Sequence, residues 1–301
     1  MKNLRPLLVA LLVIGGLAAC GKEGEKPASS GEPAPPTTVE ETTTTAPETD
    51  EAGEATEIAV TGKEYAYDAD VEGITAGPIS VTLDNEGEEE HQVSIVRLKP
   101  GKTQADFAAL GADVSQFDEV LETFGGPNAV APGESNSSLQ VLEPGDYFFA
   151  CFIPAPDGQP HAAKGMVLPL TVGEAEGEVA ELPEEEQSLA LQDYAFGFGD
   201  DALLEAGAYT VSNKGPQAHE VAIYAPAEGS DAQDVVDYFG NPTPSGPPPA
   251  TSAGGIGPID PGRTVNIELE AGEYVFVCFI PDAADGAPHF TKGMIQVVTV
   301  E

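Results

Sequence analysis

The sequence predicts an all-β protein in which two copies of one β-sandwich domain follow each other along a chain of 301 residues. Short runs of alternating apolar and polar residues are separated by turn residues, a pattern typical of strands in a sandwich. Several motifs also return about 128 residues later; Asn85-Glu-Gly87, for example, returns as Asn213-Lys-Gly215. A period of that length is too long for a solenoid unit, so each copy is a domain in itself.

The first twenty residues indicate export and lipid anchoring. Lys2 and Arg5 precede an apolar run over 7–17, and small residues lead to Cys20, which predicts a secretory signal peptide over 1–19. The apolar run is too short to span a bilayer. The Leu-Ala-Ala-Cys ending resembles the bacterial lipobox, in which the Cys receives a diacylglycerol; the alternative is an ordinary signal peptide in which Cys20 falls there by chance. We expect lipidated Cys20 to anchor the folded domains to the cell membrane, outside the cytoplasm.

The segment after Cys20 is expected to be a disordered tether. Residues 20–56 are rich in Pro, Thr, Glu, Ser and Gly and have almost no large apolar residue, so they cannot bury enough surface to offset their ordering entropy. Domains over 57–173 and 188–301 follow, joined by an acidic linker over 174–187.

Each copy is expected to contain the short strands of a sandwich. The expected strands are 79–83, 93–98, 147–153 and 166–172 in the first copy, and 208–211, 221–224, 265–269, 274–280 and 295–300 in the second. Apolar residues near helical spacing predict helices over 116–124 and 232–239. The second of these leads into a Pro- and Gly-rich stretch, 241–255, which we expect to be an exposed, mobile loop.

The soft and imidazole side chains are few, and they follow the repeat. The sequence has four His, three Cys and three Met. Apart from Met1 and Cys20, all of them fall at matching positions of the two copies. The first set is His91, Cys151, His161 and Met166, and the second set is His219, Cys278, His289 and Met294. Two imidazoles, one thiolate and a weak thioether are the ligands of a blue-copper electron-transfer site.

With these residues in place, 57–173 and 188–301 resemble cupredoxins of the plastocyanin-like group. In that family the first His follows an Asn-x-Gly type turn, the Cys ends another strand, and the second His and the Met lie on the loop and strand that follow. The resemblance implies two Greek-key β-sandwiches, each with one copper ion bound by the set of four side chains named for its copy. Alternation along the strand would place Tyr147, Phe149 and Cys151 on one face, so that the thiolate emerges from an aromatic core.

The spacing between the Cys and the second His is longer than is usual in the family. Nine residues separate Cys151 from His161, and ten separate Cys278 from His289, whereas family members usually have only a few. Each excursion contains Asp-Gly, a strong turn signal. The loop can return through the Pro that precedes the His and present that His, or it can carry the His out of reach.

Two other interpretations of these residues stay open. One is a metal-free cupredoxin-like domain, because a lone His or Met in a β-sandwich more often serves packing. The other is a disulfide between Cys151 and Cys278, because exported proteins usually pair their Cys. Equivalent buried positions in separate domains are poorly placed for such a bond. Exported but unpaired thiols are better explained as metal ligands.

The net charge and the small number of His residues restrict which functions are expected. A formal net charge of -39 at pH 7 argues against nucleic acid and against adhesion to anionic lipid. The acidic surface can steer a basic redox partner or simply keep the protein soluble. We expect one-electron transfer with a redox protein partner; copper storage or delivery and a metal-free surface interaction module are the alternatives. Oxidases and nitrite reductases need further copper centres ligated largely by His, and no His is left over, so we expect no enzyme activity.

Overall fold

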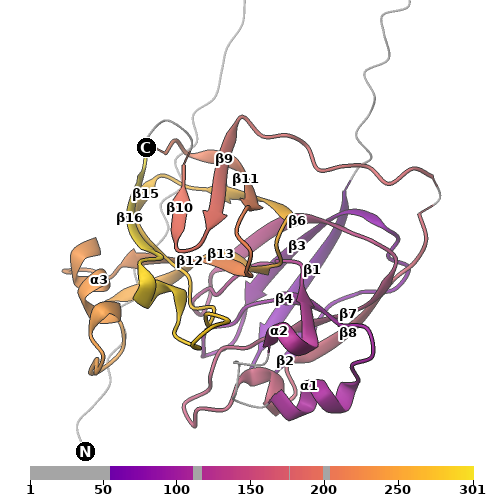
Figure 1. Cartoon of the computed structure of the whole chain (residues 1–301), viewed down its shortest axis with the longest axis horizontal. Helices are drawn as coiled ribbons and strands as arrows, with labels where there is room; N and C mark the ends of the chain where they lie inside the picture. Colours follow the sequence, from indigo (N-terminus) through magenta and orange to yellow (C-terminus); the bar gives the residue numbers. More distant parts are fainter. Residues whose placement is uncertain (1–54, 111–116, 176, 199–203) are drawn as a thin grey trace, which may run out of the picture. The chain divides into compact units, whose positions relative to one another are not determined.

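The computed structural model describes residues 55–110, 117–175, 177–198 and 204–301 (Figure 1). All of them lie in one compact unit. In the first half, residues 55–175, the strands are β1 (Thr56–Lys63), β2 (Ala66–Asp68), β3 (Gly77–Asn85), β4 (Ser94–Leu98), β5 (Leu121–Thr123), β6 (Ser135–Leu142), β7 (Gly145–Ala150) and β8 (Val167–Val172). In the second half, residues 187–301, they are β9 (Gln187–Gln192), β10 (Ala195–Gly197), β11 (Gly207–Asn213), β12 (His219–Pro226), β13 (Ala250–Ile259), β14 (Thr264–Leu269), β15 (Gly272–Val277) and β16 (Ile295–Val300).

The strands form three sheets that make two sandwiches. An eight-stranded sheet runs through both halves in the order β10-β9-β11-β14-β6-β3-β1-β2. The first half adds a four-stranded sheet, β5-β4-β7-β8, and the second adds β13-β12-β15-β16. Buried side chains from both layers meet in one core in each half. The predicted all-β fold class is confirmed.

Alternation along the strands builds these cores. On β3, Ile79, Val81 and Leu83 are completely buried, and the residues between them are not. They pack in one cluster with Tyr147 and Phe149 of β7, which are also completely buried. Burial of each such side chain stabilises the fold by about 1.5–3 kcal/mol. The pattern that predicts the strands is therefore the one that fills the core.

Two strands, β6 and β13, lack the apolar alternation from which the other strands are predicted. β6 begins with the polar run Ser-Asn-Ser-Ser, and β13 contains Gly and Pro instead of an apolar alternation. β13 also overlaps the stretch 241–255 that is expected to be a loop. That expectation is wrong for 250–255, because β13 pairs along most of its length with β12. Residues 241–247 are exposed and belong to no helix or strand.

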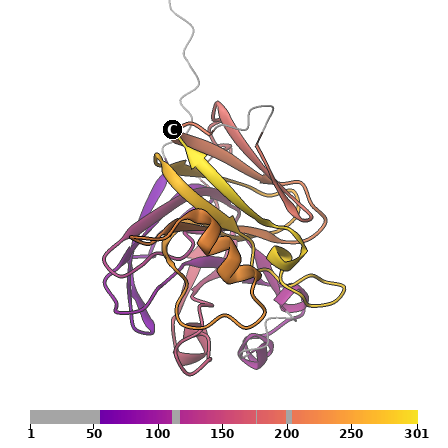
Figure 2. The ribbon, with the colours of Figure 1, turned by 90° about the vertical axis from the view of Figure 1, so that its left-hand side faces the viewer.

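The helices agree with the sequence in one half only. Helix α3 (Ala232–Gly240) matches the predicted helix; a capping box between Asp231 and Asp234 begins it, and it packs on β15 and β16 (Figure 2). The predicted helix over 116–124 is wrong in its second part. Helix α2 (Phe117–Val120) is followed at once by β5, because pairing with β4 overrides the helical spacing. A further helix, α1 (Gln104–Leu110), precedes this region.

The two halves are joined by backbone hydrogen bonding. β6 of the first half pairs with β14 of the second, and this pairing makes the eight-stranded sheet continuous. The segment after β5 also runs antiparallel to β13, with bridges at Phe124↔Ile259, Pro127↔Ile256 and Val130↔Ala253. The domain boundaries at 57–173 and 188–301 and the linker at 174–187 stay a prediction. Because backbone hydrogen bonds join the halves, we expect the two halves to unfold together.

We therefore predict one cooperative unfolding transition for the protein. Phe276 is completely buried in the second core, and replacing it with Ala should cost about 3–5 kcal/mol. In scanning calorimetry, Phe276→Ala should move the whole transition to lower temperature. Val297→Ala, at a site that is 42% exposed, should leave it nearly unchanged. Two transitions, of which Phe276→Ala moves only one, would contradict this coupling.

Candidate metal centres

A turn after β3 positions the first His of the first set. Asn85 is buried, and its side chain donates to the carbonyl oxygens of Glu89 and Val130 at 2.9 Å and accepts from the Gly87 N–H at 2.9 Å. A Cβ on Gly87 would lie 2.5 Å from His91 Nε2. Only glycine lets the turn lie this close to the ring. The Asn-x-Gly motif therefore seats His91.

The corresponding turn of the second half is built in the same way. Asn213 donates to the carbonyl oxygens of Gln217 at 2.7 Å and Ile259 at 2.8 Å. A Cβ on Gly215 would lie 2.7 Å from His219 Nε2. In both turns, therefore, glycine is required because any side chain would collide with the ring of the following His.

The long loop in the first half returns its His to the Cys. Cys151 follows the end of β7, and the next residues form a narrow excursion closed by a bridge between Pro154 and Pro160. Gly158 turns it with a φ of 81°. The His161 N–H then donates to Ile153 O at 2.9 Å. The alternative in which this loop carries the His out of reach is excluded.

The second loop closes in the same manner. Pro281 and Pro288 form its bridge, and Gly286 turns it with a φ of 73°. The His289 N–H donates to Ile280 O at 2.9 Å. In both halves a short 3₁₀ helix begins at the His, over His161–Lys164 and His289–Lys292.

The structure gathers the first set of predicted residues in one buried place. His91 Nδ1 and His161 Nδ1 are 3.2 Å apart, and Cys151 Sγ is 3.4 Å from His161 Nδ1. All three side chains are completely buried. Met166 is completely buried too, and its backbone bonds to both neighbours: its carbonyl accepts from the Cys151 N–H at 3.2 Å, and its N–H donates to His161 O at 3.0 Å.

The second set has the same arrangement. His289 Nδ1 lies 3.0 Å from His219 Nδ1 and 3.5 Å from Cys278 Sγ, and the sulfur lies 4.0 Å from His219 Nδ1. These three side chains and Met294 are completely buried. The Cys278 N–H donates to Met294 O at 3.1 Å. Each half therefore presents two Nδ1 atoms and one sulfur to a common point.

Burial sets the protonation of these groups. It raises the pKa of the Cys151 thiol to about 12 and raises that of Cys278 further. It lowers the pKa of His91, His161 and His219, and burial together with the nearby His219 lowers the pKa of His289 to about 4. At neutral pH the rings are neutral and hold a free lone pair, as metal binding requires, while the thiols have a proton that a metal must displace.

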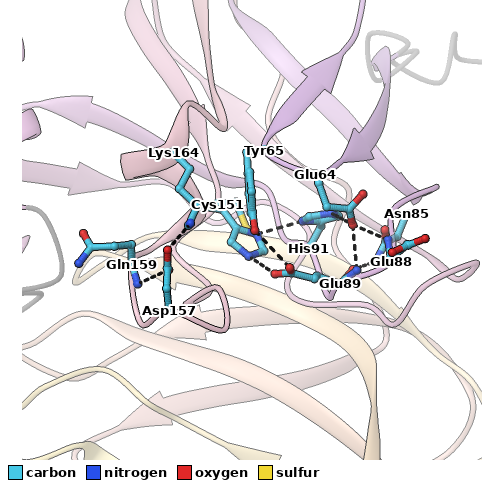
Figure 3. A network of polar contacts seen from close by, with 11 residues as sticks. Glu64, Tyr65, Asn85, Glu88, Glu89, His91, Cys151, Asp157, Gln159 and Lys164 are labelled. Carbon is cyan, nitrogen blue, oxygen red and sulfur yellow. Dashed lines mark hydrogen bonds and ion pairs between the residues drawn. The ribbon is translucent and has the colours of Figure 1, made fainter.

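Carboxylates behind the rings hold them, and they differ between the halves. His161 Nε2 lies 2.9 Å from Glu89 Oε2. Tyr65 donates to Glu89 Oε1 at 3.2 Å, and Glu64 Oε1 lies 3.6 Å from His91 Nε2 (Figure 3). In the second half the hydrogen-bonded carboxylate lies on the first His, with His219 Nε2 2.7 Å from Asp193 Oδ1. Carboxylates in this position fix the ring tautomer of a metal-binding His. Sequence patterns missed them, because acidic residues occur at nearly every spacing in this chain.

A tyrosine covers the second His of each set. The ring centroids of Tyr65 and His161 lie 5.0 Å apart, and Lys164 Nζ lies 4.9 Å from the centroid of the tyrosine ring. The second half repeats this edge-on contact, with Tyr194 and His289 centroids 5.1 Å apart and Lys292 Nζ 5.3 Å from the centroid of the Tyr194 ring. These layers keep water from the two buried imidazoles.

The donor sets fit one copper ion each. Metal bonds of about 2.0 Å to nitrogen and 2.3 Å to sulfur place ligand atoms roughly 3 to 4 Å apart around one ion, and the distances above fall in that range. A His₂Cys set with a weak thioether suits copper. Cys151 and Cys278 are free thiols, which contradicts the disulfide alternative.

No protein-family model and no curated protein matches the chain. Among solved structures, reduced auracyanin from the photosynthetic bacterium Roseiflexus castenholzii is 26% identical over 40% of this chain and 99% of that chain, with a TM-score of 0.28. Auracyanin A from Chloroflexus aurantiacus, described as a blue copper protein, is 17% identical over 40% of this chain and 100% of that chain, with a TM-score of 0.31. The chain is thus similar over two fifths of its length to these auracyanins, and its own structure holds two groups of the His, Cys, His type that could bind a metal ion.

The expectation of no enzyme activity is contradicted. Copper nitrite reductase from Nitrosomonas europaea matches 82% of this chain and 94% of that chain at 15% identity and a TM-score of 0.25, and a multicopper oxidase matches 81% and 88% at 14% identity and a TM-score of 0.23. The matches that span both halves are thus titled as enzymes. Counting the His limits the number of copper centres in one chain, but it does not decide what a bound copper catalyses. That expectation is withdrawn.

Proposed function

We propose that the chain binds two copper ions, one in each half, and transfers single electrons through them. The observation that carries this proposal is the paired convergence of two imidazole nitrogens and a thiol sulfur inside two sandwich cores. The ligands would be His91, Cys151, His161 and Met166 in the first site, and His219, Cys278, His289 and Met294 in the second. Copper, when bound, supplies the one-electron redox couple.

The protein's own groups prepare each site for that ion. The Asn-x-Gly turn seats the first His, the closed loop returns the second, and neutral imidazoles are available at neutral pH. Glu89 and Asp193 orient one ring in each site. The tyrosine layer and the apolar core keep water away. A site held in a closely packed core changes little between oxidation states, and this favours electron transfer over storage or delivery.

Location and partners form a further part of the proposal. Cys20, the signal peptide predicted over 1–19 and most of the predicted tether lie outside the described residues. Among the residues described, no helix is long and apolar enough to cross a membrane. We propose that lipidated Cys20 anchors the protein to the outer face of the cell membrane. There the acidic surface would steer a redox protein with a basic docking face.

Cys20→Ala tests the anchor. The variant should be released from membranes or stay unprocessed, because no thiol is left for the diacylglycerol. Fractionation of cells, followed by mass spectrometry of the N-terminal peptide, measures both outcomes. A variant that is still lipidated and membrane-bound would refute the assignment of Cys20.

Cys151→Ser and Cys278→Ser test the sites. The full-length protein should bind two copper ions, each single variant one, and the double variant none, because a soft site without its thiolate loses most of its Cu(I) affinity. Metal analysis after gel filtration counts the ions, and visible spectra follow the thiolate-to-Cu(II) band, which should halve in each single variant. Val297→Ser, on the exposed face of β16, is the control and should retain two ions. Two tightly bound ions in the double variant would overturn the proposal.

A further inference from the structure

Two segments of similar sequence meet where the halves join. Residues 125–133 read GGPNAVAPG, and residues 254–262 read GGIGPIDPG. They run antiparallel, with backbone hydrogen bonds that come in equivalent pairs. The Gly125 N–H donates to Pro258 O at 2.8 Å, and the equivalent Gly254 N–H donates to Ala129 O at 2.9 Å. The backbone of the junction is therefore nearly symmetric. A side chain that occurs in only one of the two segments marks a difference between the halves.

The two segments differ in this way at one position beside the second site. The fourth residue of the segment is Asn128 in the first half and Gly257 in the second. The residue after the first His also differs: it is Gln92 in the first half and Glu220 in the second. Gln92 bonds within its own half, with Nε2 donating to Ser94 Oγ at 3.0 Å. Glu220 instead bonds across the junction.

Glu220 lies between the junction and the predicted ligands of the second site. Its side chain is buried, and both oxygens have partners: Oε1 accepts from the Phe279 N–H at 2.9 Å, and Oε2 accepts from Asn128 Nδ2 at 3.4 Å. Phe279 follows Cys278 directly, and Glu220 follows His219. One carboxylate thus bonds the backbone beside the thiol and is itself fixed beside a predicted imidazole ligand.

Asn128 is held so that its amide must point at this carboxylate. It is 2% exposed. Its Nδ2 also donates to Ile256 O at 2.9 Å and Val221 O at 3.3 Å, while its Oδ1 accepts from the Ala129 N–H at 2.8 Å. Three acceptors around Nδ2 and a donor at Oδ1 leave one orientation for the amide. A side chain of the first half, that of Asn128, therefore bonds a residue beside the second site. The equivalent residue of the second half, Gly257, has no side chain that could make such a bond.

We propose that Asn128 of the first half is a positioning residue for the second copper site and acts through Glu220. This inference rests on the proposed function. Hydrogen bonds and charge around a metal-bound thiolate tune its potential. The second site should therefore depend on the junction between the halves through Asn128 and Glu220.

The test is a double-variant cycle in the full-length chain with Cys151→Ser, so that every copper signal belongs to the second site. Asn128→Ala and Glu220→Gln are made singly and together. Each single variant should change the Cu(I) to Cu(II) ratio at a fixed ambient potential by about tenfold, which is ~59 mV for one electron. The visible band should move as well. Because Asn128 acts through Glu220, the double variant should match Glu220→Gln alone.

Thr123→Val is the matched control. Thr123 Oγ1 also donates across the junction, to Asp260 Oδ1 at 2.9 Å, but neither residue bonds Asn128 or Glu220, so this variant should not shift the second site. An unchanged potential in Asn128→Ala, or equal shifts from Asn128→Ala with and without Glu220→Gln, would overturn the inference while leaving the proposed function intact. Absence of copper binding in the Cys151→Ser parent would instead refute the proposed function. If Asn128→Ala does not fold, Asn128→Ser takes its place with the same expected outcomes.

Discussion

The structure depends on how each half buries two imidazoles and a thiol together. Buried polar groups cost free energy unless they find partners, yet each half places such a set where no solvent reaches it. In each half a carboxylate bonds one of the two rings, Glu89 on His161 and Asp193 on His219, while the Nδ1 atoms and the sulfur face one another at 3.0–4.0 Å. An ion bound at that point would satisfy the remaining lone pairs and take the place of the thiol proton.

The surrounding fold provides the rigidity that such a set needs. Closely packed sandwich cores resist rearrangement, and the Cys stands directly after a strand whose Tyr147 and Phe149 fill the core in the first half. The excursions between Cys and His do not loosen the sites, because their own bridges close them and lysine–aspartate pairs brace them. In the first half this pair is Lys164 and Asp157, at 2.5 Å. The shared eight-stranded sheet joins the halves, and at their junction Asn128 of the first half bonds Glu220 beside the second site.

Much of this follows from the sequence, for identifiable reasons. The strands with clear alternation, such as β3, were predictable because one face of each is buried. The two His, Cys, His groups that the fold gathers could be found because the chain has so few His and Cys. The Gly-rich β13 and the polar start of β6 were not predictable, since pairing across the junction creates them. Glu89, Asp193 and Glu220 were hidden among many acidic residues, and only folding shows which carboxylates face a ring.

Voltammetry of the copper-loaded protein tests the central claim most directly, namely that each site holds its copper in a rigid core and changes little when the charge of the ion changes. The account predicts a reversible one-electron wave for each site, with the same copper content before and after many cycles, because Cys and Met suit Cu(I), imidazole suits Cu(II) and the core resists rearrangement. Copper that is expelled on reduction, or that becomes irreversibly bound, would contradict this account and favour storage or delivery.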